Sequence, residues 1–214
     1  MADLDRREEF LISMYNQLMN DINRHIVVVW QSIATLVAAV ATFSLVKDNI
    51  LSTDIASSIV LLACIWLLAH VYDASYWYNR NLVIIANIER QFLIRSDLND
   101  IHYYFGEHRP KNVMLSHLEI QKWLGISVAI LVLFGHFVKE ILPLISSFKD
   151  FELLNLSPWI IAFYGCLIWN SQYLIGRKKY KEFLDNSPGI TIDTSEIKYD
   201  IGHGFKNNHP GNGE

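Results

Sequence analysis

The stretch that decides the fold is residues 25–46, HIVVVWQSIATLVAAVATFSLV, which is apolar along nearly all of its length. A helix needs about 20 such residues to cross the hydrocarbon core of a bilayer. A second apolar stretch, residues 55–71, follows after a short polar segment, and neither glycine nor proline occurs anywhere before Gly106. Because these two residues mark most turns and helix ends, the first 105 residues predict two very long helices joined by one short loop.

Each of these two helices is longer than a membrane requires. A helix of about 40 residues rises about 60 Å at 1.5 Å per residue, whereas hydrocarbon accounts for about 30 Å. Before residue 25, apolar side chains recur at three- and four-residue steps: Phe10, Leu11, Met14, Tyr15, Leu18 and Ile22. Beyond the aromatic residues 76–78, the second helix carries a stripe and is expected to end near 97–100: Asn81, Ile85, Ile88, Phe92 and Arg95. We expect the two extensions to pair antiparallel as a helical stalk.

Four apolar segments predict an all-α integral membrane protein with four transmembrane helices: His25–Val46, Ile55–Trp77, Trp123–Ile145 and Pro158–Ile175. The composition agrees, since 51% of the residues are hydrophobic and the mean hydropathy is +0.19. Ser52 or Thr53 is expected to cap the second helix, the third to start around Val113 and the fourth to end around Asp185.

The predicted organisation has three parts: a cytoplasmic amphipathic helix (1–24), a four-helix membrane domain (25–185) and a weakly ordered C-terminal tail (186–214). The membrane domain includes a cytoplasmic extension, residues 78–122. If this extension and both termini share one side, that side holds fifteen of the 18 basic residues, and the other side holds only Lys47, Lys139 and Lys149. Basic residues gather in cytoplasmic loops, so we expect both termini in the cytoplasm, with 177–181 as a headgroup anchor.

The sequence contains no signature of an enzyme or of a cofactor site. A phosphate-cradling glycine loop, a metal-binding helix motif and a nucleophile elbow are all missing, so we expect neither catalysis nor a bound metal or cofactor. The two cysteines, Cys64 and Cys166, lie within apolar spans and are expected to be small apolar fillers.

Polar residues within the spans are candidates for lining a pore. Gln31, Thr35, Ala38 and Thr42 share one face of the first helix. This face is either a weakly polar pore lining or a seam of small residues that packs against another helix. His136 is a further lining candidate, although it and His70 lie at different depths and are equally interpreted as interhelical hydrogen-bonding groups.

Basic residues of the expected stalk and its following loop form a candidate ligand site: Arg80, Arg90, Arg95, Arg109 and Lys111. Gathered around the axis of an oligomer, they would ring a cytoplasmic vestibule and bind a phosphorylated ligand through charge-assisted contacts. The alternative is ordinary cytoplasmic positive charge, with ion pairs on a solvated helix.

Residues 76–93, YWYNRNLVIIANIERQFL, resemble a segment of small bacterial helical membrane proteins. Those proteins resemble the membrane effectors of anti-phage nucleotide-signalling systems, which include SLATT-type effectors and the channel subunit of the Hailong system. The resemblance implies a homo-oligomeric channel of the bacterial inner membrane, controlled by a nucleotide-derived ligand, whose opening dissipates the membrane potential and arrests the infected cell. It implies roles in ligand contact or assembly for Arg80, Asn81, Glu89 and Arg90. A partner nucleotidyltransferase would supply the ligand, such as an oligonucleotide or a cyclic nucleotide, and analogy suggests a tetramer.

Two other classes of membrane protein fit the same helices. One is a non-conducting scaffold that recruits a cytoplasmic partner through its stalk. The other is a small transporter, which usually has broken helices and internal repeats, and the unpunctuated first half offers neither.

Overall fold

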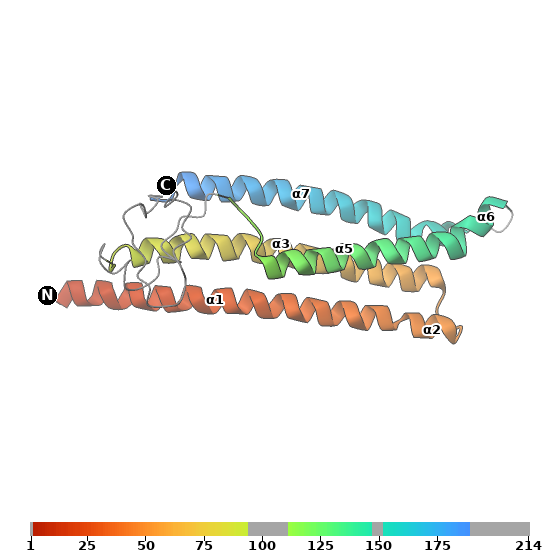
Figure 1. Ribbon diagram of the computed structural model, residues 1–214, viewed down its shortest axis with the longest axis horizontal. Helices are drawn as coiled ribbons and strands as arrows, with labels where there is room; N and C mark the ends of the chain where they lie inside the picture. The colour runs from red at the N-terminus through yellow and green to blue at the C-terminus, as the bar shows by residue number, and fades with distance from the viewer. Residues whose placement is uncertain (1, 94–110, 147–151, 189–214) are drawn as a thin grey trace, which may run out of the picture.

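A computed structural model describes residues 2–93, 111–146 and 152–188, and these residues are almost entirely helical (Figure 1). The main helices are α1 (Ala2–Ala41), α3 (Thr53–Glu89), α5 (Ser116–His136) and α7 (Ser157–Asp185). Shorter pieces lie between them: α2 (Phe43–Lys47), the π-helical turn η1 (Phe137–Ile141), α6 (Leu142–Ser146) and the 3₁₀ turn η3 (Leu153–Leu156). With these extensions, four helices of the described residues are long and apolar enough to cross a membrane, as predicted.

The first half of the chain forms the two long helices that its sequence predicts. α1 has 40 residues and α3 has 37. One small break separates α1 from α2 at Thr42, whose hydroxyl donates to the carbonyl of Ala39 at 2.6 Å. The connecting loop turns at Asn49, which has a φ of 57°. Ser52, one of the two expected caps, accepts a hydrogen bond from the amide of Ile55 at 3.2 Å.

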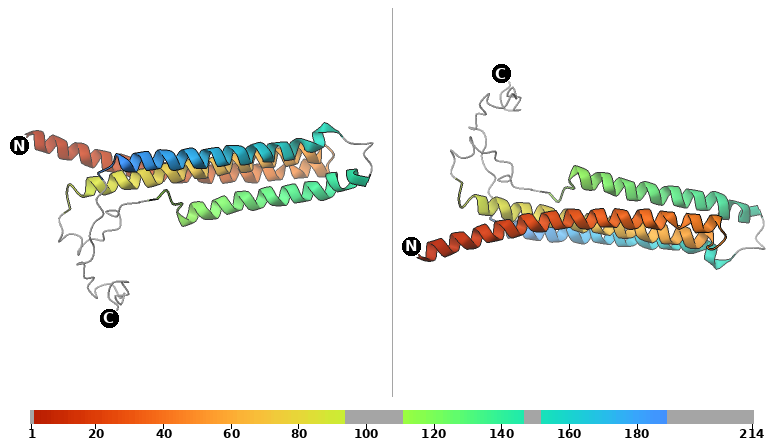
Figure 2. Two further views of the ribbon diagram at one scale, coloured as in Figure 1. Left: turned by 90° about the horizontal axis from the view of Figure 1, so that it is seen from above. Right: turned by 90° about the horizontal axis from the view of Figure 1, so that it is seen from below.

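α3 is the central helix of the molecule. Each of the other three long helices packs along it, and no two of those three pack extensively on one another. The two views of Figure 2 place α5 apart from α1 and α7, with α3 between them. Residues of α3 are buried on several faces, and Val60, Leu67 and Val71 are fully enclosed. Small residues such as Ala56 and Ala63 let neighbouring helices approach closely, so a single helix can support three partners.

The predicted antiparallel packing of the two extensions is confirmed, with apolar side chains of α1 against apolar side chains of α3, and we call this packed pair the stalk. Ile22 of α1 is buried with Leu82 and Ile85 of α3, and partly buried side chains surround this cluster: Tyr15, Leu18, Met19, Ile26 and Tyr78. At the far end, the Arg7 guanidinium donates to the side chain of Gln91 at 3.2 Å. The stalk also has a member that the sequence did not predict, because the last turns of α7 lie against α3 through Tyr180 and Phe183.

Two helix boundaries differ from the sequence-based predictions. α3 ends at Glu89 and not near 97–100, because the amides of Gln91 and Phe92 bond three residues back, to Ile88 and Glu89, and tighten the chain into a turn. α5 starts at Ser116 and not at Val113, since the carbonyl of Val113 accepts a hydrogen bond from the side chain of Asn79 in α3. The end of α7 at Asp185 agrees with the prediction.

Parts of the predicted organisation fall outside the described residues. The expected tail, 186–214, is described only as far as residue 188, and residues 94–110 of the predicted cytoplasmic extension lie outside the described part of the chain. The outward faces of α1, α5 and α7 carry many exposed large apolar side chains, including Trp30, Leu131 and Phe163. Extended apolar surface of this kind is rare on monomeric soluble proteins and suits contact with lipid or with further copies of the chain.

Candidate functional site

The candidate ligand residue Arg80 packs between aromatic rings in the stalk. Its guanidinium carbon lies 5.0 Å from the ring centre of Trp77 and 5.7 Å from that of Phe183. Cation–π contacts of this kind are worth about 0.5–1 kcal/mol where solvent reaches them. Arg80 therefore helps to hold α7 against α3, while part of its surface stays open to solvent.

Arg90 caps the end of α3 and reaches toward the residues that follow α7. Its Nη1 atom donates to the side-chain oxygen of Asn87 at 3.1 Å and to the carbonyl of Pro188 at 3.4 Å. Asn87 in turn donates to Ser187 at 3.1 Å. Partial burial lowers the pKa of Arg90 from its ordinary value, because desolvation disfavours the charged form. The guanidinium still titrates far above neutral pH and stays positive there.

The structure brings only part of the predicted basic site together within one chain. Arg80 and Arg90 are ten residues apart on one helix, so about 15 Å separates them along its axis. Lys111 is exposed and precedes Asn112, whose side chain accepts a hydrogen bond from Asn79 at 2.9 Å. Lys111 thus lies near the level of Arg80. Arg95 and Arg109 lie outside the described residues, and a complete basic ring remains a prediction.

Glu89 is a stalk residue whose environment the sequence did not reveal. One carboxylate oxygen accepts a hydrogen bond from the Tyr15 hydroxyl at 3.4 Å, and the other is buried without a partner among the described residues. Burial raises the pKa of Glu89 to about 7, and the bond from Tyr15 opposes part of that rise. Burial, together with the nearby carboxylate, also raises the pKa of Tyr15. Glu89 therefore changes charge near neutral pH inside the α1–α3 contact.

The candidate pore face of α1 is uncovered within the chain. Gln31, Thr35 and Ala38 are exposed, and the hydroxyl of Thr35 donates to the carbonyl of Gln31 at 3.1 Å. Thr42 is half-buried and bonded to Ala39. Because both hydroxyls are satisfied by their own helix, the face is only weakly polar. It suits either of the two roles expected for it, a pore lining or a packing seam between subunits.

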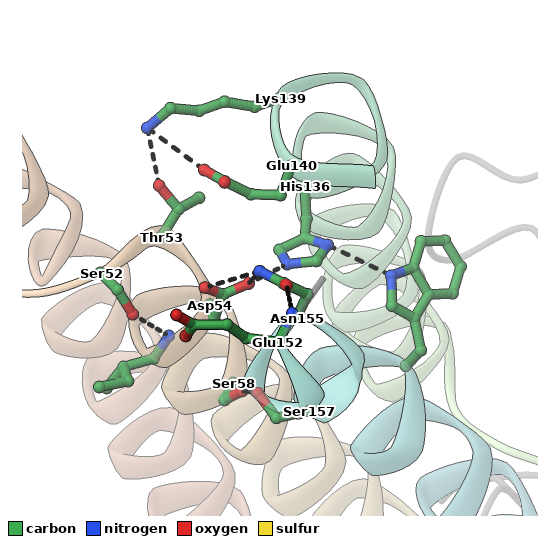
Figure 3. Close-up of polar contacts among 12 residues, drawn as sticks. Ser52, Thr53, Asp54, Ser58, His136, Lys139, Glu140, Glu152, Asn155 and Ser157 are labelled. Atoms are coloured by element: carbon green, nitrogen blue, oxygen red, sulfur yellow. Dashed lines mark hydrogen bonds and ion pairs between the residues drawn. The ribbon is translucent and has the colours of Figure 1, made fainter. Parts of the chain in front are cut away.

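His136 is the centre of a buried polar cluster at the end of the molecule opposite the stalk (Figure 3). Only 1% of this residue is exposed. Its Nε2 atom lies 2.8 Å from Oδ1 of Asp54, and its Nδ1 atom is 3.2 Å from the indole nitrogen of Trp159. An indole nitrogen can only donate, so Nδ1 accepts and Nε2 carries the proton toward Asp54. His136 therefore forms hydrogen bonds between helices, which is one of the two roles expected from the sequence. Its pore-lining role stays a prediction.

The cluster joins three helices at one end of the molecule, close to the first residues of α3 and α7 and the last residue of α5. Asp54 belongs to α3, His136 to α5 and Trp159 to α7, and Asn155 of η3 donates to Asp54 at 3.3 Å. Beside them, Lys139 donates to the Thr53 hydroxyl at 2.7 Å, and the Ser58 and Ser157 hydroxyls are 3.0 Å apart. His70 takes no part, since it packs edge-on against Trp66. Sequence reasoning missed Asp54 because its position beside Ser52 resembles an ordinary helix start.

No protein-family model, curated protein or solved structure matches this chain. In the part of the chain that the structure describes, no group of three or more histidine, cysteine or acidic residues is placed to hold a metal ion.

Proposed function

We propose that the chain is the subunit of an oligomeric ion channel in the bacterial inner membrane. In this proposal a nucleotide-derived ligand controls the pore, and opening disrupts the membrane potential in phage defence and arrests the infected cell. The observation that supports it most is the exposed polar face of α1, with Gln31 and Thr35, on a helix of membrane-spanning length.

An exposed glutamine amide is costly in hydrocarbon, where it finds no hydrogen-bonding partner. Assembly of several copies with α1 around a shared axis would place Gln31 either against its copies or beside a water-filled path. The small residue Ala38 on the same face would allow close approach. In such an assembly the same face of α1 would both pack against neighbouring copies and border the pore, so the two interpretations are compatible.

The proposed ligand site lies in the stalk. Oligomerisation would multiply the positive charge of Arg80, Arg90 and Lys111 around the axis, and such a ring suits a phosphate-bearing ligand. The nucleotide class and the role in defence come from the resemblance of residues 76–93, and the four copies come from analogy. A partner enzyme that makes nucleotides would supply the signal.

Membrane potential in bacterial cells that express the full chain, measured with a voltage-sensitive dye, tests this function. We expect depolarisation when a partner that makes the ligand is active. Replacing Gln31 by leucine should weaken it severalfold, whereas Val37→Leu, on the same helix and 65% exposed, should not. Unchanged potential in every case would count against the proposal.

A non-conducting scaffold is the alternative, and exposed apolar residues on the stalk favour it. Phe10 is 65% and Ile12 54% exposed on α1, beyond the expected membrane boundary. Such residues suit a docking surface for a soluble partner. The scaffold predicts that Phe10→Ser releases a bound partner while the membrane potential stays constant throughout. Depolarisation by the wild-type chain would exclude it.

A further inference from the structure

A groove of about 630 Å³ runs between α1–α2 and α5, at the end of the molecule opposite the stalk. Its walls are mainly aliphatic and aromatic: Val40, Phe43, Val46, Val128, Leu131 and Val132. From Val128 of α5 to Lys139 of η1 the groove extends over eleven residue steps, or about 16 Å. Its volume lies within the range of about 300–1,000 Å³ that is common for small-molecule sites.

The polar groups of the groove gather at its end. Lys47 of α2 and Lys139 of η1 both line it there, as does Thr53. Lys139 donates to Thr53 and lies 3.8 Å from Glu140. An ammonium has three donors, so Lys139 keeps a hydrogen for a further acceptor. Lys47 is exposed at the end of its helix. Among the residues that line the groove in the described part of the chain, the charged ones are therefore Lys47 and Lys139, and Glu140 lies beside Lys139.

Two further polar residues line the groove itself: His136, which is bonded to Asp54 and Trp159, and Ser57. Ser57 of α3 is 1% exposed and lines the groove, and its hydroxyl has no hydrogen-bonding partner among the described residues. Buried hydroxyls are normally bonded. An unpartnered one in the wall of an open groove points to a ligand that brings an acceptor or donor there.

The local backbone keeps the groove open. Gly135 lines it, and a Cβ atom added at this position would meet nothing within 4 Å. Immediately afterwards the helix widens into the π-helical turn η1, which positions Lys139 at the mouth. Single π-helical turns within α-helices are frequent at functional sites.

We propose that this groove binds one anionic phospholipid. An acyl chain lies along the apolar walls, the phosphate is held between Lys47 and Lys139, and the ester region reaches the Ser57 hydroxyl. The cationic mouth and the apolar walls together select this occupant, since a phospholipid carries an anionic phosphate and an acyl chain in one molecule. The inference depends on the membrane insertion contained in the proposed function, and it is independent of conduction and of ligand gating.

Native mass spectrometry of the full chain in mild detergent, with phosphatidylglycerol or phosphatidylcholine added, tests the site. We expect one tightly retained phosphatidylglycerol per subunit, with apparent affinity at least fivefold above that of phosphatidylcholine. Gly135→Leu should fill the groove and lower retention at least tenfold. Gly176→Leu is the matched control, because that glycine of α7 also has open space around its Cβ position and lies outside the groove.

A second pair of variants tests the charged mouth without altering the groove walls. Removing each lysine should weaken phosphatidylglycerol binding about fivefold, so Lys47→Gln with Lys139→Gln should weaken it about 25-fold. Arg6→Gln with Arg24→Gln, both exposed on α1 and far from the groove in the sequence, should change it less than twofold. This pair keeps the test informative if Gly135→Leu fails to fold.

Equal retention of the two lipids, or equal effects of the groove and control variants, would overturn the inference. Flotation of the same proteins with phospholipid vesicles separates this failure from failure of the proposed function. A chain that floats but retains no groove-dependent lipid contradicts only the lipid site. A chain that does not float contradicts the membrane function as well.

Discussion

Glu89 and Asp54 are two carboxylates that α3 holds in different ways. Glu89, in the stalk, is half-buried beside the hydroxyl of Tyr15. Asp54, at the opposite end of the helix, accepts hydrogen bonds from His136 and Asn155 in a nearly closed cluster. Neither arrangement could be predicted from the sequence, because the partners are separated by 74, 82 and 101 residues and no local pattern links them.

The titration of Glu89 should make the stalk less stable as the pH rises. Its folded-state pKa of about 7 lies above the ordinary 4.5, so the folded chain binds more protons than the unfolded chain between these values. The contribution of Glu89 to the free energy of unfolding is complete below about pH 4.5 and is lost by about pH 7.5. Because Glu89 is partly exposed to solvent, we expect only about 1 kcal/mol after solvent screening.

Glu89→Gln should flatten this dependence, since glutamine can still accept from Tyr15 but does not titrate. Thermal unfolding of the full chain in detergent from pH 4.5 to 8 measures the effect. Glu182→Gln, which removes an exposed carboxylate of α7, is the control. The same slope in the Glu89 variant and in the wild type would show that Glu89 titrates at its usual pH.

Asp54→Ala should destabilise the end of the molecule opposite the stalk. The substitution leaves the Nε2 proton of the buried His136 without its acceptor, which costs about 1–3 kcal/mol. Asp48→Ala, an exposed loop residue, should change stability by less than about 0.5 kcal/mol. Unfolding by denaturant in detergent measures both variants, and similar stabilities would contradict a structural role for the cluster.

The helices themselves were largely predictable, because hydropathy and the absence of glycine and proline act within each segment. The antiparallel contact of Ile22 with Leu82 and Ile85 followed from the two apolar stripes. The end of α3 at Glu89 did not, since the sequence after it keeps the same apolar spacing and the turn depends on contacts of Arg90 with residues that follow α7. The contact of α7 with the stalk was not predicted from the sequence. The basic run of α7, residues 177–181, is also typical of a segment that anchors a helix at lipid headgroups.

Close packing of α7 on α3 depends on Gly165. A Cβ atom there would lie 2.4 Å from Cδ1 of Ile65 and 2.6 Å from its Cγ1. Gly165→Ala should therefore cost about 1–3 kcal/mol through overpacking, and Ile65→Ala in the same chain should restore part of it. Gly176→Ala meets open space and should be neutral or slightly stabilising. Thermal unfolding compares these variants, and a neutral Gly165→Ala would contradict the close α3–α7 contact.

Continuity of α3 through Asn79 should couple the stalk to the spans. The Asn79 side chain donates to the carbonyl of Ser75 at 2.7 Å and also to Asn112 and Val113, so it joins α3 to the segment before α5. Insertion of two glycines after Asn79 should break this connection and abolish ligand control of conductance. Their insertion after Asn49, in the loop, is the control. Unchanged gating in the first variant would exclude coupling through α3.

In the described residues, three long helices are arranged around α3, and at one end α1 and α3 extend as the stalk. The outward faces of the molecule are apolar over membrane-spanning lengths, whereas the Gln31–Thr35 face of α1 is weakly polar and uncovered within the chain. These features support an assembly in a membrane, and the copy number and ligand cannot follow from one chain, because both depend on contacts between subunits.

Planar-bilayer recording of the purified full chain tests the proposed pore most directly. The account predicts discrete conductance steps whose open probability changes when oligonucleotides or cyclic nucleotides are added on the stalk side. Gln31→Leu should alter the size of the steps, and Val37→Leu should leave it unchanged. Verified insertion of the protein with no conductance, either with or without these nucleotides, would contradict it.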